Sequence, residues 1–475
     1  MSIKNNKTTE SVASNLRTII DEKYVLTDDA SRMIYSRAVH PLEFKRFQMA
    51  DYTNAPMIIV QPENSEQIQE ILSFANVNKI PIVPYGGGSG IVEGTALGDC
   101  IVIDMKRFDQ IKINKENNTV TVGAGVNGRN LEEYLNQNGF TFGHFPQSMN
   151  SATIGGYVAT AAIGTFSGRY GKMEDIVVGL EAILPTGEIL KVKPIPRRSS
   201  GPHLEGLLIG SEGMFGIITE AILKIYSVPE SRKWLCYTFE NTPKGLKALK
   251  RLIQQDVRPA LVRLYDEAEA EMRIKKYSLP KNHSLLFLAF EGPYDLINWQ
   301  INQAEKILNE CGGQPQLLDA ALDWYQYRFD TSGMLRFNQE PNGIADSLEI
   351  AAPWDKIEGL WRNVRAALEP LAEVVHVHFS HIYDNECSAY VIFYARANEG
   401  TEEAAISLYR RCLQATMNTC IESGGTISHH HGVGRAKSPW MRCEHGGAGW
   451  ETIVKLKHAL DPNFILNPGV WGIEK

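Results

Sequence analysis

The sequence predicts an α+β fold made of two main domains and a closing C-terminal segment. At 475 residues the chain exceeds what a single hydrophobic core normally holds, so two or three domains are expected. Short strands alternate with helices from residue 56 to about residue 230, whereas strands separated by long helices follow to about residue 420. We therefore predict a first domain over 16–230, a second over 231–425 and a closing segment over 426–475.

The first domain opens on a strand and a helix. The run "PMIIVQP" predicts a short buried strand, and Ser65 is the predicted N-cap of a helix over 66–79 with apolar residues at helical spacing. Asn117–Asn118 is the predicted turn between two strands. The remaining predicted elements are strands before the glycines of 86–90, at 100–105 and within 110–125, a helix at 129–137, and mixed elements over 174–192 and 216–230.

The second domain alternates strands with long helices. Strands are predicted at 233–240, 259–266 and 283–292, and helices at 244–255 and 297–313. This pattern is typical of an antiparallel sheet with a helical layer. The closing segment contains a predicted helix at 450–460.

Composition narrows the class of protein. The net charge of −7 and the pI near 6.0 leave no basic excess for a nucleic-acid partner. Seven cysteines without a CxxC pair argue against a disulfide framework or a thiolate zinc site and favour a reducing cytosol. Residues 1–15 are polar and predict a disordered lead without a signal peptide.

The longest apolar run, "LLFLAF", is too short to cross a bilayer, so we expect a cytoplasmic protein without a transmembrane segment. This expectation leaves peripheral membrane contact open. A homodimer is the assembly that base rates favour.

Three glycine-bearing loops are the strongest functional signal. They are "PYGGGSGIVEG" at 84–94, "PQSMNSATIGGYVAT" at 146–160 and "LIGSEGMFGIITEA" at 208–221. The first is neither a Rossmann site nor a P-loop, because a strand and not a helix follows it and it lacks GK[ST]. Consecutive glycines nevertheless allow backbone amides to converge on a pyrophosphate. Each loop alone is also compatible with a plain turn.

In order and combination, these loops resemble the FAD-binding domain of the p-cresol methylhydroxylase (PCMH) and vanillyl-alcohol oxidase superfamily. The resemblance implies a PCMH-type, two-subdomain FAD-binding domain, a cap domain that carries the substrate site, and a C-terminal segment that returns to the FAD domain. It implies that the first loop wraps the pyrophosphate, the second approaches the flavin ring, and the third closes over the adenosine end or the flavin edge. The implied cofactor-binding residues are Pro84, Tyr85, Gly86, Gly87, Gly88, Ser89, Gly90, Gln147, Ser148, Thr153, Gly155, Gly156, Thr160, Ala161, Ala162, Glu212, Gly213, Gly216, Ile217 and Ile218.

Within the superfamily, the C-terminal half resembles alkyldihydroxyacetonephosphate synthase more than the D-2-hydroxy-acid dehydrogenases. The segment "VHFSHIYDNECSAYVIFYAR" lacks the H-x-GDGN-x-H metal stretch of many of those dehydrogenases, and "GGTISHHHGVGRAK" replaces their Glu-His-Gly. The resemblance implies exchange of the acyl group of acyl-dihydroxyacetone phosphate for a fatty alcohol through a flavin N5 adduct, in ether lipid synthesis. The alternative is an FAD-linked oxidoreductase acting on a D-2-hydroxy acid or a related alcohol.

The same resemblance implies roles for six residues. Tyr390 matches the catalytic tyrosine, and His429, His430 and His431 match the essential histidine run. Arg336 matches an arginine that binds the substrate phosphate, and Arg263 matches a second arginine required for activity. A guanidinium fork is well suited to a phosphate dianion. The phenol of Tyr390 could exchange a proton if neighbouring positive charge lowers its pKa.

Each of these residues also has a plainer interpretation. Tyr390 lies in an apolar strand, where a tyrosine is often a core residue, and Arg263 alternates with apolar residues, as a solvent-facing strand arginine does. His376, His378 and His381 show strand alternation and are expected on a polar face or in supporting positions. Cys387 and Cys443 show no sign of a partner.

The histidine run raises the question of a metal site. If residues 429–431 are extended, His429 and His431 share one face and His430 takes the other, so the three cannot easily bind one ion. We therefore expect no metal and interpret the run as an acid–base cluster over the flavin. A turn whose histidines only line the pocket is the alternative.

Overall fold

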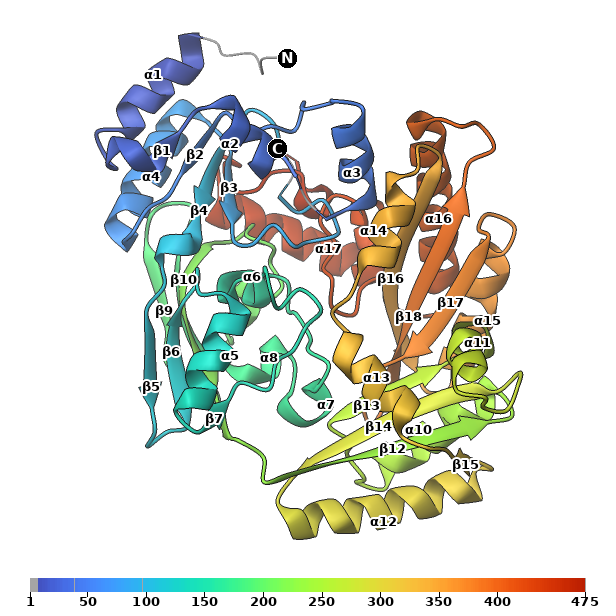
Figure 1. Ribbon diagram of the computed structural model, residues 1–475. Helices are drawn as coiled ribbons and strands as arrows, with labels where there is room; N and C mark the ends of the chain where they lie inside the picture. Colours follow the sequence, from blue (N-terminus) through green and yellow to red (C-terminus); the bar gives the residue numbers. More distant parts are fainter. Residues whose placement is uncertain (1–6, 38, 96, 475) are drawn as a thin grey trace.

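The computed structural model describes residues 7–37, 39–95 and 97–474 and arranges them as two domains lying side by side (Figure 1). The first domain holds two main sheets, and the second holds one large antiparallel sheet. The predicted α+β fold with an antiparallel cap domain is confirmed.

The first subdomain is a small sheet in the order β1-β2-β4-β3, in which β2, β4 and β3 are parallel and β1 is antiparallel to β2. The three β2 residues and the four β4 residues are all buried, because helices cover the sheet. Asn64, and not the predicted Ser65, caps α4, since its side chain accepts from the Gln67 amide. The elements are α1 (Lys7–Leu16), β1 (Val25–Leu26), α2 (Asp29–Tyr35), α3 (Pro41–Gln48), β2 (Ile58–Val60), α4 (Ser65–Asn78), β3 (Ile82–Tyr85) and β4 (Ile101–Asp104).

The N-terminal segment corrects one prediction. Residues 7–16 form helix α1, whereas the sequence predicts a disordered lead over 1–15; residues 1–6 lie outside the described part of the chain. Val12, Ala13 and Leu16 are buried in the core of the first domain. A short apolar stripe within a polar segment is therefore enough to order this helix, because the domain offers a surface that covers it.

The second subdomain is an antiparallel sheet in the order β5-β6-β10-β8-β9. The turn at Asn117–Asn118 joins β5 to β6 as predicted, and Asn118 has a positive φ of 49°. The elements are β5 (Ile111–Asn114), β6 (Thr119–Gly123), α5 (Gly128–Gln137), β7 (Phe140–Thr141), α6 (Ile154–Ala159), α7 (Ser167–Tyr170), α8 (Met173–Ile176), β8 (Val177–Ile183), β9 (Ile189–Val192), α9 (Glu205–Leu208), β10 (Ile217–Lys224) and β11 (Tyr226–Ser227).

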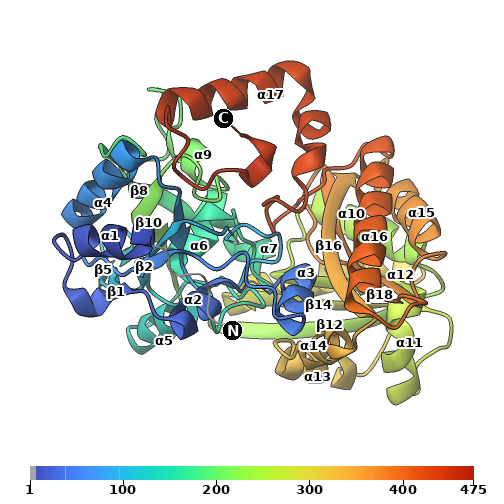
Figure 2. The ribbon, with the colours of Figure 1, turned by 90° about the horizontal axis from the view of Figure 1, so that it is seen from above.

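The cap domain is an antiparallel sheet in the order β15-β12-β14-β13-β17-β18-β16. Helices α10, α12, α15 and α16 supply the apolar layer on one face, and the other face packs toward α7 of the first domain (Figure 2). The elements are β12 (Ser231–Phe239), α10 (Thr242–Gln254), β13 (Leu261–Tyr265), α11 (Glu267–Lys276), β14 (Ser284–Gly292), α12 (Tyr294–Glu310), β15 (Gln314–Pro315), α13 (Asp319–Tyr327), α14 (Ser332–Gln339), β16 (Gly343–Pro353), α15 (Ile357–Leu368), β17 (Val374–Phe379), β18 (Glu386–Arg396) and α16 (Glu402–Glu422).

The closing segment crosses from the cap back to the first domain. Helix α17 (Met441–Leu460) runs between them, and Leu466 forms a parallel bridge with Ile82 of β3 (Figure 2). Lys457 and Asp461 form a fully buried ion pair of 2.7 Å, and the Asp461 carboxylate accepts from the amides of Ile465 and Leu466. The turn that carries the three histidines therefore lies at the junction of the two domains.

Candidate active site

The three glycine-bearing loops pack against one another. A Cβ added at Gly87 would overlap the carbonyl oxygen of Ser151, and one added at Gly86 would overlap Oγ1 of Thr153. A Cβ at Gly213 would lie 3.2 Å from Pro84. The glycines are required here because the three backbones approach more closely than side chains allow.

The first loop has free amides at its surface. Within the described residues, the backbone amides of Gly87, Gly88, Ser89 and Gly90 donate to no protein acceptor. Gly88 has a φ of 62°, which turns this run of amides at the end of β3. Such a nest of unpaired N–H groups fits the oxygens of a pyrophosphate without needing positive charge.

Parts of the second and third glycine-bearing segments form regular secondary structure. Thr153 caps the short helix α6, which contains Gly155 and Gly156, and its Oγ1 accepts from the Gly156 amide at 3.4 Å. Ile217 and Ile218 belong to β10 and are buried in the apolar core of the first domain. These two isoleucines support the sheet behind the loop.

Glu212 is buried, and its carboxylate is fully engaged by the protein. It accepts from the amides of Val433 and Gly434 at 2.7 and 2.8 Å and from the indole Nε1 of Trp471 at 2.8 Å. Burial raises its pKa, while these donors oppose the rise. The side chain therefore anchors the histidine turn to the first domain.

The histidine turn is compact and not extended, so the alternation of faces expected for an extended run does not apply. The ring centroids of His429 and His430 lie 5.2 Å apart and those of His430 and His431 lie 4.4 Å apart. The turn closes because Gly432 has a φ of 85° and Ser428 Oγ donates to the Gly432 carbonyl at 2.8 Å. The three rings therefore form a single cluster.

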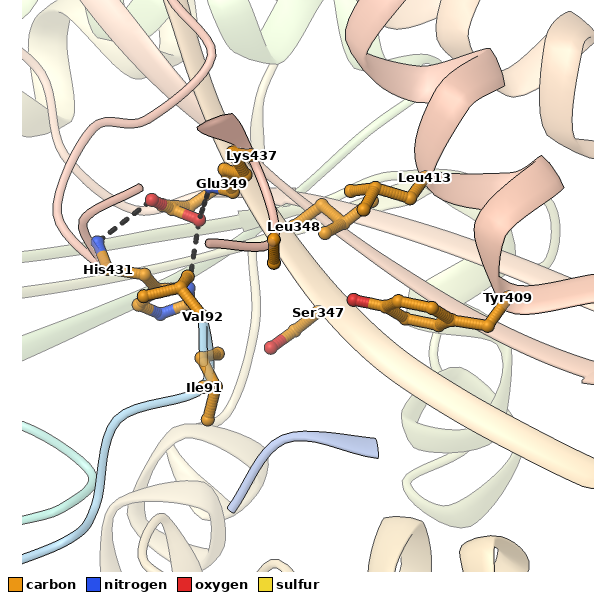
Figure 3. A pocket seen from close by; sticks show the side chains of 10 residues that line it. Ile91, Val92, Ser347, Leu348, Glu349, Tyr409, Leu413, His431 and Lys437 are labelled. Atoms are coloured by element: carbon orange, nitrogen blue, oxygen red, sulfur yellow. Dashed lines mark hydrogen bonds and ion pairs between the residues drawn. The ribbon is translucent and has the colours of Figure 1, made fainter. Parts of the chain in front are cut away.

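Both domains hold this turn. Lys172 of the first domain donates to the His429 carbonyl at 3.0 Å. From the cap, the buried Glu349 of β16 accepts from the His431 amide at 2.8 Å and from Ser428 Oγ at 2.6 Å. A narrow pocket at this edge of β16 is lined by Ile91 and Val92 after the glycine loop and by Ser347, Glu349, His431 and Lys437 (Figure 3).

Tyr390 of β18 lies between two histidine rings. His378 stacks on it at 4.7 Å with an interplanar angle of 18°, and His430 stacks at 5.9 Å with an angle of 22°. The phenol donates to Ser347 Oγ at 2.9 Å. Burial raises the pKa of Tyr390 to about 12, although Ser347 and Arg263 lower it. The condition of a lowered pKa is therefore not met, and Tyr390 keeps its proton at neutral pH.

His429, His430 and His378 are held neutral by their surroundings. Burial and then Lys172 lower the pKa of His429 to about 3, and burial and His431 hold the pKa of His430 well below its ordinary value. His378, paired with Glu269 at 2.9 Å, has its pKa lowered to about 4 by burial and by Arg263. Neutral imidazoles each offer one donor and one acceptor, as proton transfer requires.

A hydrogen-bonded chain links Tyr383, His429 and His430. The phenol of Tyr383 lies 3.1 Å from Nε2 of His429, and Nδ1 of His429 lies 3.0 Å from Nδ1 of His430. Burial raises the pKa of Tyr383, so the phenol keeps its proton. If Tyr383 donates to His429, the His429 Nδ1–H donates to His430, and Nε2–H of His430 is then free to act as a donor.

We expect Tyr383→Phe to lower kcat about tenfold with little change in KM, because His429 loses the partner that fixes its tautomer. Steady-state kinetics at equal bound flavin would measure the effect. An unchanged kcat would show that the chain does not relay a proton.

The structure brings Arg263 to this cluster but not Arg336. Arg263 donates from Nε to the Tyr265 hydroxyl at 3.0 Å, and its charge acts on Tyr390 and His378. Arg336 is exposed on α14 and donates to Ser332 on the same helix. The helix phase explains this, because the following Phe337 packs on Tyr394 and directs Arg336 outward.

Sequence reasoning missed Glu349, Lys437 and Tyr383, and it assigned His378 only a supporting place. Glu349 did carry a signal, since it and Asp346 are carboxylates within the mostly apolar run "GIADSLEIAAP". Among the described residues, no group of three or more His, Cys, Asp and Glu side chains could hold a metal ion. None of the described helices is long and apolar enough to span a membrane.

A glycine-lined nest of free amides beside a buried tyrosine–histidine cluster defines a flavoprotein site, and the cofactor is FAD. The chain belongs to the FAD-linked oxidase family of the PCMH and vanillyl-alcohol oxidase superfamily. Residues 56–193 match the FAD binding domain and residues 228–470 match the FAD linked oxidases, C-terminal domain. The resemblance seen in the sequence is thus confirmed.

The curated relatives include alkyldihydroxyacetonephosphate synthases and FAD-linked oxidoreductases. Alkyldihydroxyacetonephosphate synthase of Caenorhabditis elegans is 30% identical over 86% of this chain and 74% of its own length. The FAD-linked oxidoreductase YgcU of Escherichia coli K12, itself uncharacterised, is 32% identical over 88% and 90%. The mitochondrial D-lactate dehydrogenase (cytochrome) 1 of Saccharomyces cerevisiae is 27% identical over 93% and 75%.

Solved structures agree with the fold. An alkyldihydroxyacetonephosphate synthase matches with a TM-score of 0.81 at 23% identity, covering 98% of this chain and 86% of that one. p-Cresol methylhydroxylase with bound substrate matches with a TM-score of 0.82 at 17% identity, covering 99% and 98%. At these identities the likeness concerns the fold.

Proposed function

We propose that this flavoenzyme exchanges the acyl group of acyl-dihydroxyacetone phosphate for a fatty alcohol, giving the alkyl ether and the free fatty acid without net reduction. The carrying observation is the stack of His378, Tyr390 and His430, joined through His429 to Tyr383. The relatives named alkyldihydroxyacetonephosphate synthase support this proposal.

Cofactor binding is proposed for the three loops. The amides of Gly87 to Gly90 would take the pyrophosphate, and the segments at 147–153 and 160–162 would line the flavin end. Glu212 would act indirectly, by placing the histidine turn next to the third loop. FAD, when bound, supplies an electron sink for the carbon from which the acyl group leaves.

The protein's own groups would handle the protons. Tyr390 keeps its phenolic proton because burial raises its pKa, so it would act as a donor to a substrate oxygen. His430 would accept the α-proton of the substrate or return it, depending on the tautomer that His429 imposes. Arg263 adds positive charge on the same side, suited to a phosphate dianion.

An FAD-linked oxidoreductase acting on a D-2-hydroxy acid or related alcohol is the second candidate. The similarity to YgcU and to a D-lactate dehydrogenase supports it. The same tyrosine and histidines would then remove the substrate hydroxyl proton. We expect the protein to work in the cytoplasm on a small or lipid-phosphate substrate, with peripheral membrane contact and a homodimer as further expectations.

Anaerobic mixing of the FAD-loaded protein separates the two reactions. Palmitoyl-dihydroxyacetone phosphate and hexadecanol are expected to yield the ether and palmitate while the flavin absorbance stays oxidised at the end. Lasting bleaching by a D-2-hydroxy acid, with no ether formed, would replace this proposal by the oxidoreductase.

The two arginines give a matched pair of variants. Arg263→Ala is expected to lower kcat/KM for the phosphate-bearing substrate on the order of 100-fold, because a charge-assisted contact to a dianion is lost. Arg336→Ala is expected to change it less than about threefold, since a surface arginine away from the site contributes little. A larger effect at Arg336 would restore the sequence-based assignment.

A further inference from the structure

The buried carboxylate of Glu349 accepts several hydrogen bonds from the histidine turn and from Lys437. Its Oε1 accepts from Ser428 Oγ at 2.6 Å, from the His431 amide at 2.8 Å and from the His430 amide at 3.4 Å. Its Oε2 accepts from Lys437 Nζ at 2.9 Å. The side chain is completely buried.

The same carboxylate also reaches a histidine ring. Nδ1 of His431 lies 2.9 Å from Oε2 of Glu349, an ion-pair contact without the alignment of a hydrogen bond. Figure 3 shows Glu349 between His431 and Lys437, on the strand that carries Ser347. One oxygen thus holds the backbone of the turn, while the other holds the ring of His431 and the ammonium of Lys437.

The sheet register connects this arrangement to Tyr390. Glu349 of β16 is the direct cross-strand partner of Tyr390 on β18, and the ring of His431 meets that of Tyr390 edge to face at 5.5 Å. Any shift of Glu349 would therefore move the histidines relative to the phenol.

Glu349 stays ionised inside the protein. Burial by itself would raise its pKa, but the charges of His431 and Lys437 hold it well below the ordinary value. The Lys437 ammonium is equally buried and also donates to the Ile427 carbonyl at 3.0 Å. Apolar residues of similar volume often stabilise a fold as well as a buried charge pair does, so the stability of the fold does not by itself account for this pair.

We propose that Glu349, supported by Lys437, is a positioning residue that sets the orientation of His430 and His431 against Tyr390. This inference rests on the proposed catalytic role of the histidines but not on which of the two reactions they serve. It assigns the cap strand β16 the role of orienting the histidines, whereas Glu212 and Lys172 attach the same turn to the first domain.

The test uses the double variant Glu349→Gln/Lys437→Met in the FAD-loaded full-length protein. Removing both charges avoids an unpaired buried ammonium, which would unfold the single variant for a trivial reason. The expected result is a kcat per bound flavin about 10–100-fold lower, with KM within about threefold and FAD still bound. Both candidate reactions are assayed, so that a wrong reaction assignment is recognised separately.

The buried pair Lys457 and Asp461 provides the matched control. Asp461 also holds a turn through two amides, but it lies at the end of α17 and contacts none of the histidines at 429–431. Its partner Lys457 donates to the Met214 carbonyl of the third loop, so kcat is compared at equal bound flavin. Asp461→Asn/Lys457→Met is expected to lower Tm and to leave kcat per bound flavin unchanged. An equal loss of kcat in this control would show that Glu349 acts through the stability of the fold and not by positioning the histidines.

A second readout does not depend on turnover. In histidine-labelled protein, the NMR signals of the His430 and His431 rings are expected to broaden or double in the Glu349→Gln/Lys437→Met variant. Sharp, unshifted signals together with a kcat within about threefold of wild type would overturn the proposal.

Discussion

Tyr390→Phe is expected to lower kcat by about 10²–10⁴-fold while FAD affinity and Tm stay close to wild type. The phenylalanine ring can keep the stacking with His378 and His430, so the change removes only the hydroxyl. Rapid mixing under anaerobic conditions would measure the chemical step directly. Full activity in both the exchange and the hydroxy-acid assays would remove Tyr390 from the mechanism.

Ser347→Ala is the control for this variant. Ser347 accepts the hydrogen bond of the phenol at 2.9 Å, so alanine keeps the catalytic group and loses only its orientation. We expect a decrease of about tenfold, smaller than that of Tyr390→Phe. Equal losses would indicate that the hydroxyl serves to orient the strand and not to transfer a proton.

Gly87→Ala is expected to weaken FAD binding on the order of 100-fold or more, equivalent to about 2.8 kcal/mol. The added methyl group would overlap the carbonyl oxygen of Ser151, a backbone atom that cannot rotate away. The loop must shift, and the four free amides then lose their common direction. Titration of the apoprotein with FAD, followed by flavin fluorescence, would give the affinity.

Gly206→Ala serves as the matched glycine variant, because a Cβ there meets no atom within 4 Å. It is expected to bind FAD like wild type. Circular dichroism of the Gly87→Ala apoprotein shows whether the variant is folded. A wild-type spectrum would mean that only the FAD-binding loop is disturbed. Retention of wild-type affinity by Gly87→Ala would place the pyrophosphate elsewhere.

Local sequence was sufficient for the elements and for the cofactor. Apolar runs bounded by turn residues located the strands at 58–60, 101–104 and 284–292. The order of three glycine loops indicated FAD through its resemblance to a known FAD-binding domain. These features are local because the periodicity of apolar residues and the backbone freedom of glycine are properties of a few neighbouring residues. The N-terminal helix was missed because its apolar stripe is short and its stability comes from packing.

The chemistry of the candidate site depended on distant residues. The family resemblance assigned Tyr390, Arg263 and Arg336 to the site, and the structure brings Arg263 but not Arg336 close to Tyr390. The sequence had no means of pairing Glu349 with Lys437 or Tyr383 with His429. It also left open whether the histidine run is extended and whether the pKa of Tyr390 is lowered. Both depend on what surrounds the residue in space.

The sequence by itself determined the fold class, the domain that binds FAD and the residue types available for proton transfer. Only the tertiary structure decided which of those residues meet, because the turn at 428–434 is shaped by Glu349 from the cap and by Glu212 from the first domain. Burial then set the charge states of Tyr390, His429 and His430, since desolvation penalises their ionised forms.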